Sequence, residues 1–218
     1  IVGNTDYSTE IVTKWTTTAP GQSVNYVESH DNMTLADKIT ASVKDAKPAD
    51  IAQLSQLAAS IALLSQGMPF IQAGQEFLRS KGGDTNSYKS SDLVNSLKWG
   101  TQSANAATVK YYKGLIALRK AHPAFRMATT DLVKKNLKFL TSPEGTIAYS
   151  INGSDVKDSA STIIVVHNAN TTAQTITLPK SGSWSVLVES GRAGTTVLRK
   201  ITGGSVTVEA RSTLVITQ

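Results

Sequence analysis

The spacing of apolar side chains changes near Pro123 and divides the chain into two parts. Before Pro123, short β-prone runs alternate with longer segments in which apolar residues recur every three or four positions. From Phe125 onward, apolar and polar residues alternate with the period of two that is typical of strands. Because these periods belong to different elements, we expect two units, residues 1–123 and residues 124–218.

The first part has the strand–helix–strand–helix order of parallel α/β units. The predicted elements are a strand over 24–27, a helix over 48–66, a strand over 69–73, a polar loop over 79–95 and a helix over 104–121. Pro48 favours the start of the first helix and Gly67 its end, while Pro123 ends the second helix.

The second part carries strand signals separated by turn signals such as Asn152-Gly153 and Gly203-Gly204. The predicted strands cover residues 137–140, 146–151, 162–166, 175–178, 184–188, 205–208 and 213–216. Many short strands in a segment of this length are typical of an antiparallel β-sandwich.

Composition narrows the classes of protein further. The chain has 218 residues, a formal net charge of +6 and no cysteine, which excludes a disulfide framework, a thiolate metal site and a cysteine nucleophile. The densest basic cluster, Lys134, Lys135 and Lys138, is short and lacks interleaved aromatics, so we expect no nucleic-acid partner. No apolar run is long enough for a membrane span, and the first residues show no targeting signal.

Candidate chemistry follows the two short strands of the first part. Glu28-Ser29-His30-Asp31-Asn32 comes directly after one strand, and the loop after the other carries Asn86 and Tyr88. Reactive groups in parallel α/β folds lie just past the carboxyl ends of strands, so both loops would face one cleft if the strands are neighbours. Carboxylate, imidazole, amide and phenol groups suit a hydroxyl-rich ligand.

Other interpretations of these residues stay open at this point. His30 and Asp31 could be only a capping pair that fixes the loop, and Asn86 is a common turn former. A metal site is not favoured, because His30 and Asp31 are adjacent and no metal-ligand spacing accompanies them. A Ser–His–Asp triad lacks its usual motif.

Four long segments, in the same order, resemble type I pullulanases of the α-amylase superfamily. Residues 24–35, VNYVESHDNMTL, resemble the seventh-strand region of that family, and residues 66–79, QGMPFIQAGQEFLR, resemble the eighth. Residues 81–88, KGGDTNSY, resemble the loop that follows, and residues 111–126, YYKGLIALRKAHPAFR, resemble the last barrel helix. The resemblance covers the whole chain and is weaker in the strand-rich part.

The resemblance implies that residues 1–123 are the C-terminal part of a catalytic (β/α)8 barrel, strands seven and eight with their helices. Residues 124–218 would be a C-terminal β-sandwich. It further implies retaining hydrolysis of α-1,6 linkages in pullulan, glycogen or limit dextrins by a nucleophile and a general acid that lie before residue 1. The chain alone would then be an incomplete and inactive fragment, with the N-terminal remainder of the enzyme as its partner.

The resemblance also assigns roles to single residues. Asp31 would stabilise the transition state, His30 would bind the same glucose, and Asn32 would line the cleft beside them. Asn86 and Tyr88 would hold the neighbouring glucose. We expect no cofactor in this chain, with calcium elsewhere in the full enzyme left open, and a bacterial extracellular or cell-surface location.

Two alternatives remain at this stage. The chain could be a non-catalytic glucan-binding or structural module in which the strand-rich part does the binding, although that part lacks an obvious pair of exposed stacking aromatics. Within the same superfamily, an isoamylase-like enzyme or an amylopullulanase would carry similar motifs.

Overall fold

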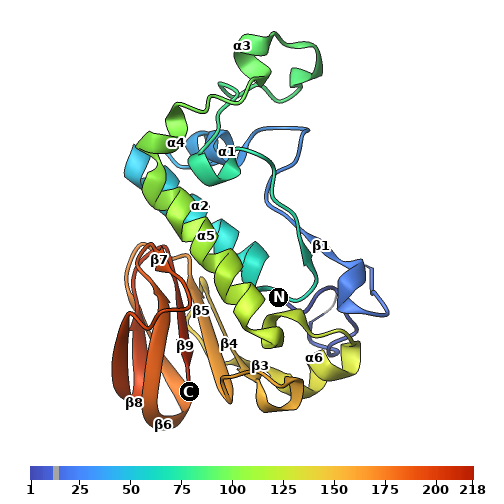
Figure 1. The fold of residues 1–218 in the computed structure, drawn as a ribbon, viewed down its shortest axis with the longest axis vertical. Coiled ribbons are helices and arrows are strands. Elements are labelled where there is room, and N and C mark those ends of the chain that lie inside the picture. Colours follow the sequence, from blue (N-terminus) through green and yellow to red (C-terminus); the bar gives the residue numbers. More distant parts are fainter. Residues whose placement is uncertain (12–14) are drawn as a thin grey trace.

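The computed structural model describes residues 1–11 and 15–218, and it places helices mainly in the first half and strands in the second (Figure 1). The α-helices are α1 (Leu35–Ser42), α2 (Pro48–Leu64), α3 (Asp92–Asn95), α4 (Thr101–Ala104), α5 (Ala106–Ala121) and α6 (Thr130–Asn136). Short 3₁₀ turns are η1 (Pro20–Gln22), η2 (Gln75–Phe77), η3 (Ser87–Lys89), η4 (Pro123–Arg126) and η5 (Ser154–Val156). The strands are β1 (Val24–Asn25), β2 (Met68–Pro69), β3 (Leu137–Leu140), β4 (Thr146–Asn152), β5 (Thr162–Asn168), β6 (Gln174–Glu189), β7 (Arg192–Ala193), β8 (Arg199–Val208) and β9 (Ser212–Thr217).

The two long helices α2 and α5 lie side by side across the middle of the molecule (Figure 1). Helix α2 begins at Pro48, whose missing N–H is no loss in the first turn, and the Asp50 carboxylate accepts the N–H of Lys47 at 3.0 Å. Helix α5 ends before His122 and Pro123, and Arg119 and Lys120 in its last turn complement the helix dipole.

Strands β1 and β2 pair in parallel, as the hypothesis of one shared cleft requires. Val24 lies opposite Met68 and Asn25 opposite Pro69, and α2 lies between the two strands in the chain. Both strands are shorter than predicted, since only two residues of each enter the ladder. Their carboxyl ends therefore open onto the same edge, where the candidate loops begin.

The remaining strands form one antiparallel sheet in the order β3-β4-β5-β9-β6-β7, with β8 also paired to β6. The predictions for β3, β4, β5 and β9 agree with the structure to within two residues at each end. The two strands predicted over 175–178 and 184–188 are parts of the single long strand β6, whose register with β8 shifts between Thr177 and Gly182.

Both faces of this sheet are buried, which explains the uninterrupted apolar run of β5. Ile163 and Val165 pack in one core with Leu64 of α2 and Leu115 of α5. Ile164 and Val166, on the opposite face, pack with side chains of β6 and β8. Instead of two separately hydrogen-bonded sheets, the described strands of this region make one sheet whose β6–β8 end folds over the β4–β5–β9 face.

Four helices escaped the sequence pattern. The one-turn helix α3 lies inside the predicted polar loop, and the one-turn helix α4 precedes the predicted helix over 104–121, while α1 and α6 are longer. Helix α6 contradicts the expectation of strands alone after Phe125, and α1 occupies a stretch with no predicted element. Each begins at a threonine whose hydroxyl accepts a backbone N–H three residues on, Thr34 from Asp37 and Thr129 from Leu132. Helices α1 and α6 are too short to show a full apolar stripe, so the threonine cap is the feature of the sequence that marks where each begins.

Candidate functional site

The loop after β1 holds His30 and Asp31 at the surface above a buried carboxylate. The Glu28 side chain is buried and accepts the backbone N–H of Leu35, where α1 begins, so it joins the two ends of the loop. Asn32 takes a left-handed conformation with φ 62° between these ends. As a result, His30, Asp31 and Asn32 project from a short, closed loop.

The loop after β2 is held by its own polar side chains. Asp84 accepts the N–H of Asn86 at 2.8 Å and the hydroxyl of Ser90 at 2.5 Å. The Asn95 amide donates to the carbonyls of Ser87 at 2.6 Å and Ser90 at 3.0 Å. These bonds fold the loop into a compact arc that carries Tyr88.

The two loops meet at a cavity of about 290 Å³. Its lining residues are His30, Asp31, Gln72, Arg79, Lys81, Ser87, Tyr88 and Asn95. Three of the five candidate residues, His30, Asp31 and Tyr88, therefore line one cavity. Asn32 and Asn86 do not line it and are exposed beside it.

The groups that line the cavity are strongly polar. His30 Nε2 lies 3.5 Å from Asp31 Oδ2, and the two side chains are 84% and 72% exposed. Arg79 and Lys81 bring positive charge to the lining, and Lys81 Nζ donates to the carbonyl oxygen of His30. Tyr88 offers an exposed ring to any ligand in the cavity. This set can hydrogen-bond neighbouring hydroxyls and stack on the face of a sugar ring.

Two buried carboxylates beneath the loops differ in their protonation. Burial raises the pKa of Glu28 to about 7, although the Leu35 N–H, Arg79 and Lys81 favour its ionised form. Burial also acts to raise the pKa of Asp37, but hydrogen bonds from Ser80 and the Lys81 backbone outweigh it and hold that pKa below its ordinary value. Asp37 is therefore a permanently charged anchor near neutral pH.

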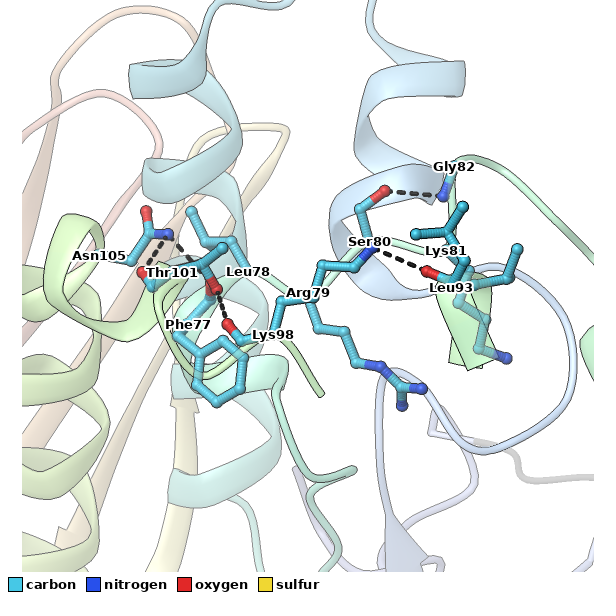
Figure 2. Close-up of a pocket in the computed structure, with 11 residues that line it drawn as sticks. Phe77, Leu78, Arg79, Ser80, Lys81, Gly82, Leu93, Lys98, Thr101 and Asn105 are labelled. Atoms are coloured by element: carbon cyan, nitrogen blue, oxygen red, sulfur yellow. Dashed lines mark hydrogen bonds between the residues drawn. The ribbon is translucent and has the colours of Figure 1, made fainter. Parts of the chain in front are cut away.

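A second cavity of about 350 Å³ adjoins the first, because Arg79 and Lys81 line both. In Figure 2, the Asn105 amide donates to the carbonyls of Phe77 and Thr101 on one side of Leu78. On the other side of Leu78, the Gly82 N–H donates to the Ser80 hydroxyl. No carboxylate lines this cavity among the described residues, and Lys98 adds a further cation. It therefore lacks the acidic group that the first cavity has.

Sequence reasoning missed the residues that support the site. Lys81 and Glu28 belong to the quoted motifs, yet nothing in their spacing indicates that Lys81 bonds to His30 and Glu28 to Leu35. Gln72 and Asn95 also line the cavity and were not candidates. No group of three or more His, Asp or Glu side chains in the described ranges is arranged to hold a metal ion. No helix in those ranges is long and apolar enough to cross a bilayer.

The chain is similar in sequence to several known proteins. The family model of the pullulanase all-beta domain matches residues 133–192. The chain is 42% identical over 170 residues to a pullulanase of Bacillus subtilis (strain 168), covering 78% of this chain and 24% of that relative. It is 30% identical over 208 residues to an isoamylase of Flavobacterium sp, covering 75% of this chain and 27% of that relative.

Solved structures show the same likeness. The maltose complex of pullulanase type I from Bacillus subtilis str. 168 matches with a TM-score of 0.90 at 34% identity, covering 99% of this chain and 30% of that one. The pullulanase from Bacillus acidopullulyticus matches with a TM-score of 0.89 at 42% identity, covering 92% and 25%. The chain thus spans about a quarter of the length of the curated relatives it matches.

The helical layer, the all-beta region and these relatives together define a class, the debranching glycoside hydrolases. Within that class, the chain belongs to the pullulanase family.

Proposed function

We propose that the chain is the C-terminal portion of a pullulanase-type enzyme that hydrolyses α-1,6-glucosidic linkages in pullulan, glycogen or limit dextrins with retention of configuration. Residues 1–123 would supply the seventh and eighth strands of a (β/α)8 barrel, and residues 124–218 a C-terminal sandwich domain. The polymeric substrates favour a location outside the cell or at its surface. The single observation that carries the proposal is the cavity where His30, Asp31 and Tyr88 meet.

Asp31 is proposed as the residue that stabilises the transition state. Its carboxylate would accept hydrogen bonds from ring hydroxyls of the glucose at the cleaved bond. These bonds strengthen as positive charge develops at the anomeric carbon. They would therefore stabilise the transition state more than the bound substrate and lower the activation barrier of the hydrolysis. His30 would bind the same glucose, and the exposed Tyr88 ring would stack on the next one. Asn32 and Asn86 would contact the glucan at the rim.

The nucleophile and the general acid would come from a part of the enzyme that precedes this chain. An exposed apolar surface supports such a partner: Val24, Tyr26, Met68 and Phe70 of the β1–β2 region are all at least 44% exposed. Tyr26 and Phe70 pack edge to face, with ring centroids 6.2 Å apart. In a closed barrel, each parallel strand is paired on both edges and covered on both faces. Further barrel strands and side chains would therefore cover this surface.

The test is an Asp31→Asn substitution in the full-length polypeptide. We expect kcat for release of maltotriose from pullulan to fall by about 10²–10³-fold, the cost of removing one preorganised group from a transition state. KM should change by less than about threefold, since neighbouring groups still bind the glucan. Steady-state assays of reducing ends and product chromatography give both quantities.

Asp45→Asn is the matched control, because Asp45 is an exposed aspartate in the turn between α1 and α2. It should leave turnover unchanged. Wild-type turnover in the Asp31 variant would overturn the assignment of Asp31. Absence of maltotriose with the unsubstituted polypeptide, alongside cleavage of amylopectin branches, would instead favour the isoamylase-like specificity.

A further inference from the structure

The loop that carries His30 and Asp31 is tied to the loop after β2 by one buried ammonium group. We propose that Lys81 is a positioning residue that fixes the main chain at His30 and thereby sets the direction of the Asp31 carboxylate. The inference rests on the proposed function of Asp31 and adds a residue that acts on it through the backbone.

The first observation is the contact itself. Lys81 Nζ donates to the carbonyl oxygen of His30 at 2.8 Å, across 51 positions of the chain. The residue is only 6% exposed, which is rare for lysine. Since the His30 carbonyl belongs to the peptide that leads into Asp31, the bond restrains the plane of that peptide.

The second observation is that Lys81 is itself anchored. Its backbone N–H donates to Asp37 Oδ2 at 2.8 Å, and the Ser80 hydroxyl donates to Asp37 Oδ1 at 2.5 Å. Asp37 lies in the first turn of α1, and its own N–H donates to Thr34. Lys81 is thus attached to a helix at one end and to the His30 loop at the other.

The third observation is that α1 and the His30 loop are tied together at their base. Glu28 accepts the Leu35 N–H, so the loop over 29–34 is closed at both ends. Three hydrogen bonds therefore hold this region: the Leu35 N–H donates to Glu28, the Lys81 N–H donates to Asp37, and the Lys81 ammonium donates to the His30 carbonyl. Loss of the Lys81 ammonium would free the His30–Asp31 segment while the other two bonds hold the surrounding fold.

Three variants of the full-length polypeptide test the proposal. Lys81→Met keeps most of the side-chain volume and deletes the ammonium, and we expect kcat on pullulan to fall by about 10–100-fold with KM within about threefold. Lys81→Arg should recover part of that loss, because it restores a cationic donor. Lys98→Met is the matched control: the exposed Lys98 also donates to a backbone carbonyl, that of Leu93 at 2.7 Å, away from the His30 loop.

A double substitution separates positioning from direct contact with glucan. Asp37 does not line the His30 cavity, and its carboxylate holds the loop after β2 through Ser80 and Lys81, so we expect Asp37→Ala to lower turnover by releasing that loop. If Lys81 acts by positioning, Lys81→Met should add little to the effect of Asp37→Ala, since both break one connected set of bonds. Multiplying effects would overturn the proposal in favour of direct binding by Lys81.

Limited proteolysis supplies a readout that does not depend on activity. Lys81→Met should speed cleavage within the loop over 29–34 by at least about tenfold and leave cleavage in the exposed turn over 43–47 unchanged, whereas Lys98→Met should change neither. Unchanged cleavage within 29–34 would overturn the proposal, as would faster cleavage with wild-type turnover. If the unsubstituted polypeptide cleaves no α-1,6 linkage, the proposed function fails while proteolysis still decides whether Lys81 holds the loop.

Discussion

The parallel pair β1–β2 and the antiparallel sheet differ in what holds them. The pair consists of two residues on each strand, and Val24 and Met68 are 51% and 54% exposed. In the sheet, Val165 and its neighbours in β5 are fully buried, with apolar cores on both faces. The candidate loops therefore leave the less supported of the two β regions, whereas the strands of the sheet lie between two apolar cores.

The parallel pair takes its support from side chains outside the ladder. Arg119 of α5 donates to the carbonyls of Leu63, Ser65 and Gly67 at 2.9, 2.7 and 2.6 Å, at the point where α2 ends and β2 begins. Gly67 has φ 102°, and a Cβ there would lie 2.9 Å from the Ser23 carbonyl oxygen. The hydrogen bonds of the Arg119 guanidinium and the close approach of the backbone at Gly67 thus support β2, because the two-residue ladder provides little pairing of its own.

The largest effect is expected in the sheet, at Trp184. This side chain is fully buried in the core between the β6–β8 end and the β4–β5–β9 face. Trp184→Ala should lower the free energy of unfolding by about 3–5 kcal/mol, the usual cost of emptying a buried aromatic site. Urea denaturation followed by far-UV circular dichroism measures it. Trp99→Ala, at a largely exposed tryptophan, is the control, and equal losses at both sites would contradict this picture of the sheet.

A smaller effect is expected at Arg119, which supports the parallel pair. Arg119→Met should lower the free energy of unfolding by about 1–3 kcal/mol, because it leaves buried carbonyl oxygens without a donor. Arg126→Met, next to it at the surface, should cost less than about 1 kcal/mol. If the two variants unfold at the same urea concentration, the carbonyls at the end of α2 do not depend on Arg119.

Much of this contrast could be predicted from the sequence, because local patterns report local pairing. The alternation over 146–151 located β4, the β-branched apolar run over 162–166 located β5, and Pro48 with Gly67 bounded α2. The fold-over of β6 and β8 was not predictable in this way. It depends on a register shift between Thr177 and Gly182 and on burial of Trp184, which only the assembled sheet determines.

The candidate site was predictable for the residues that follow strands and not for those that support them. His30 and Asp31 stand directly after β1, so the rule for carboxyl ends of parallel strands finds them. Lys81 and Glu28 act through bonds to His30 and Leu35 that no spacing along the chain encodes. Asn86 was a candidate both by its place in the loop after the second strand and by resemblance, and it lies outside the cavity lining.

Glu28 gives the region of the parallel pair a pH dependence opposite in sign to that of the sheet, where burial lowers the pKa of His167 in β5 to about 3. Burial raises the pKa of Glu28 from 4.5 to about 7, so between these values the folded chain binds more protons than the unfolded chain. The Glu28 contribution to the free energy of unfolding should therefore fall as the pH rises through that window. Glu28→Gln removes this contribution, so the variant should gain about 1 kcal/mol relative to wild type between pH 6 and pH 7. Urea titrations at both pH values measure the gain, and a constant difference would contradict the raised pKa.

The smallest effect is expected at Val24, and it tests the comparison most directly. In the 218-residue chain, Val24→Ala should cost less than about 1 kcal/mol, because half of the side chain is already in water. The same change at the fully buried Val165 should cost about 2 kcal/mol or more. In the full-length polypeptide the two costs should become similar, since the proposed barrel strands would bury Val24. If Val24→Ala remains nearly neutral there, the β1–β2 surface has no covering partner.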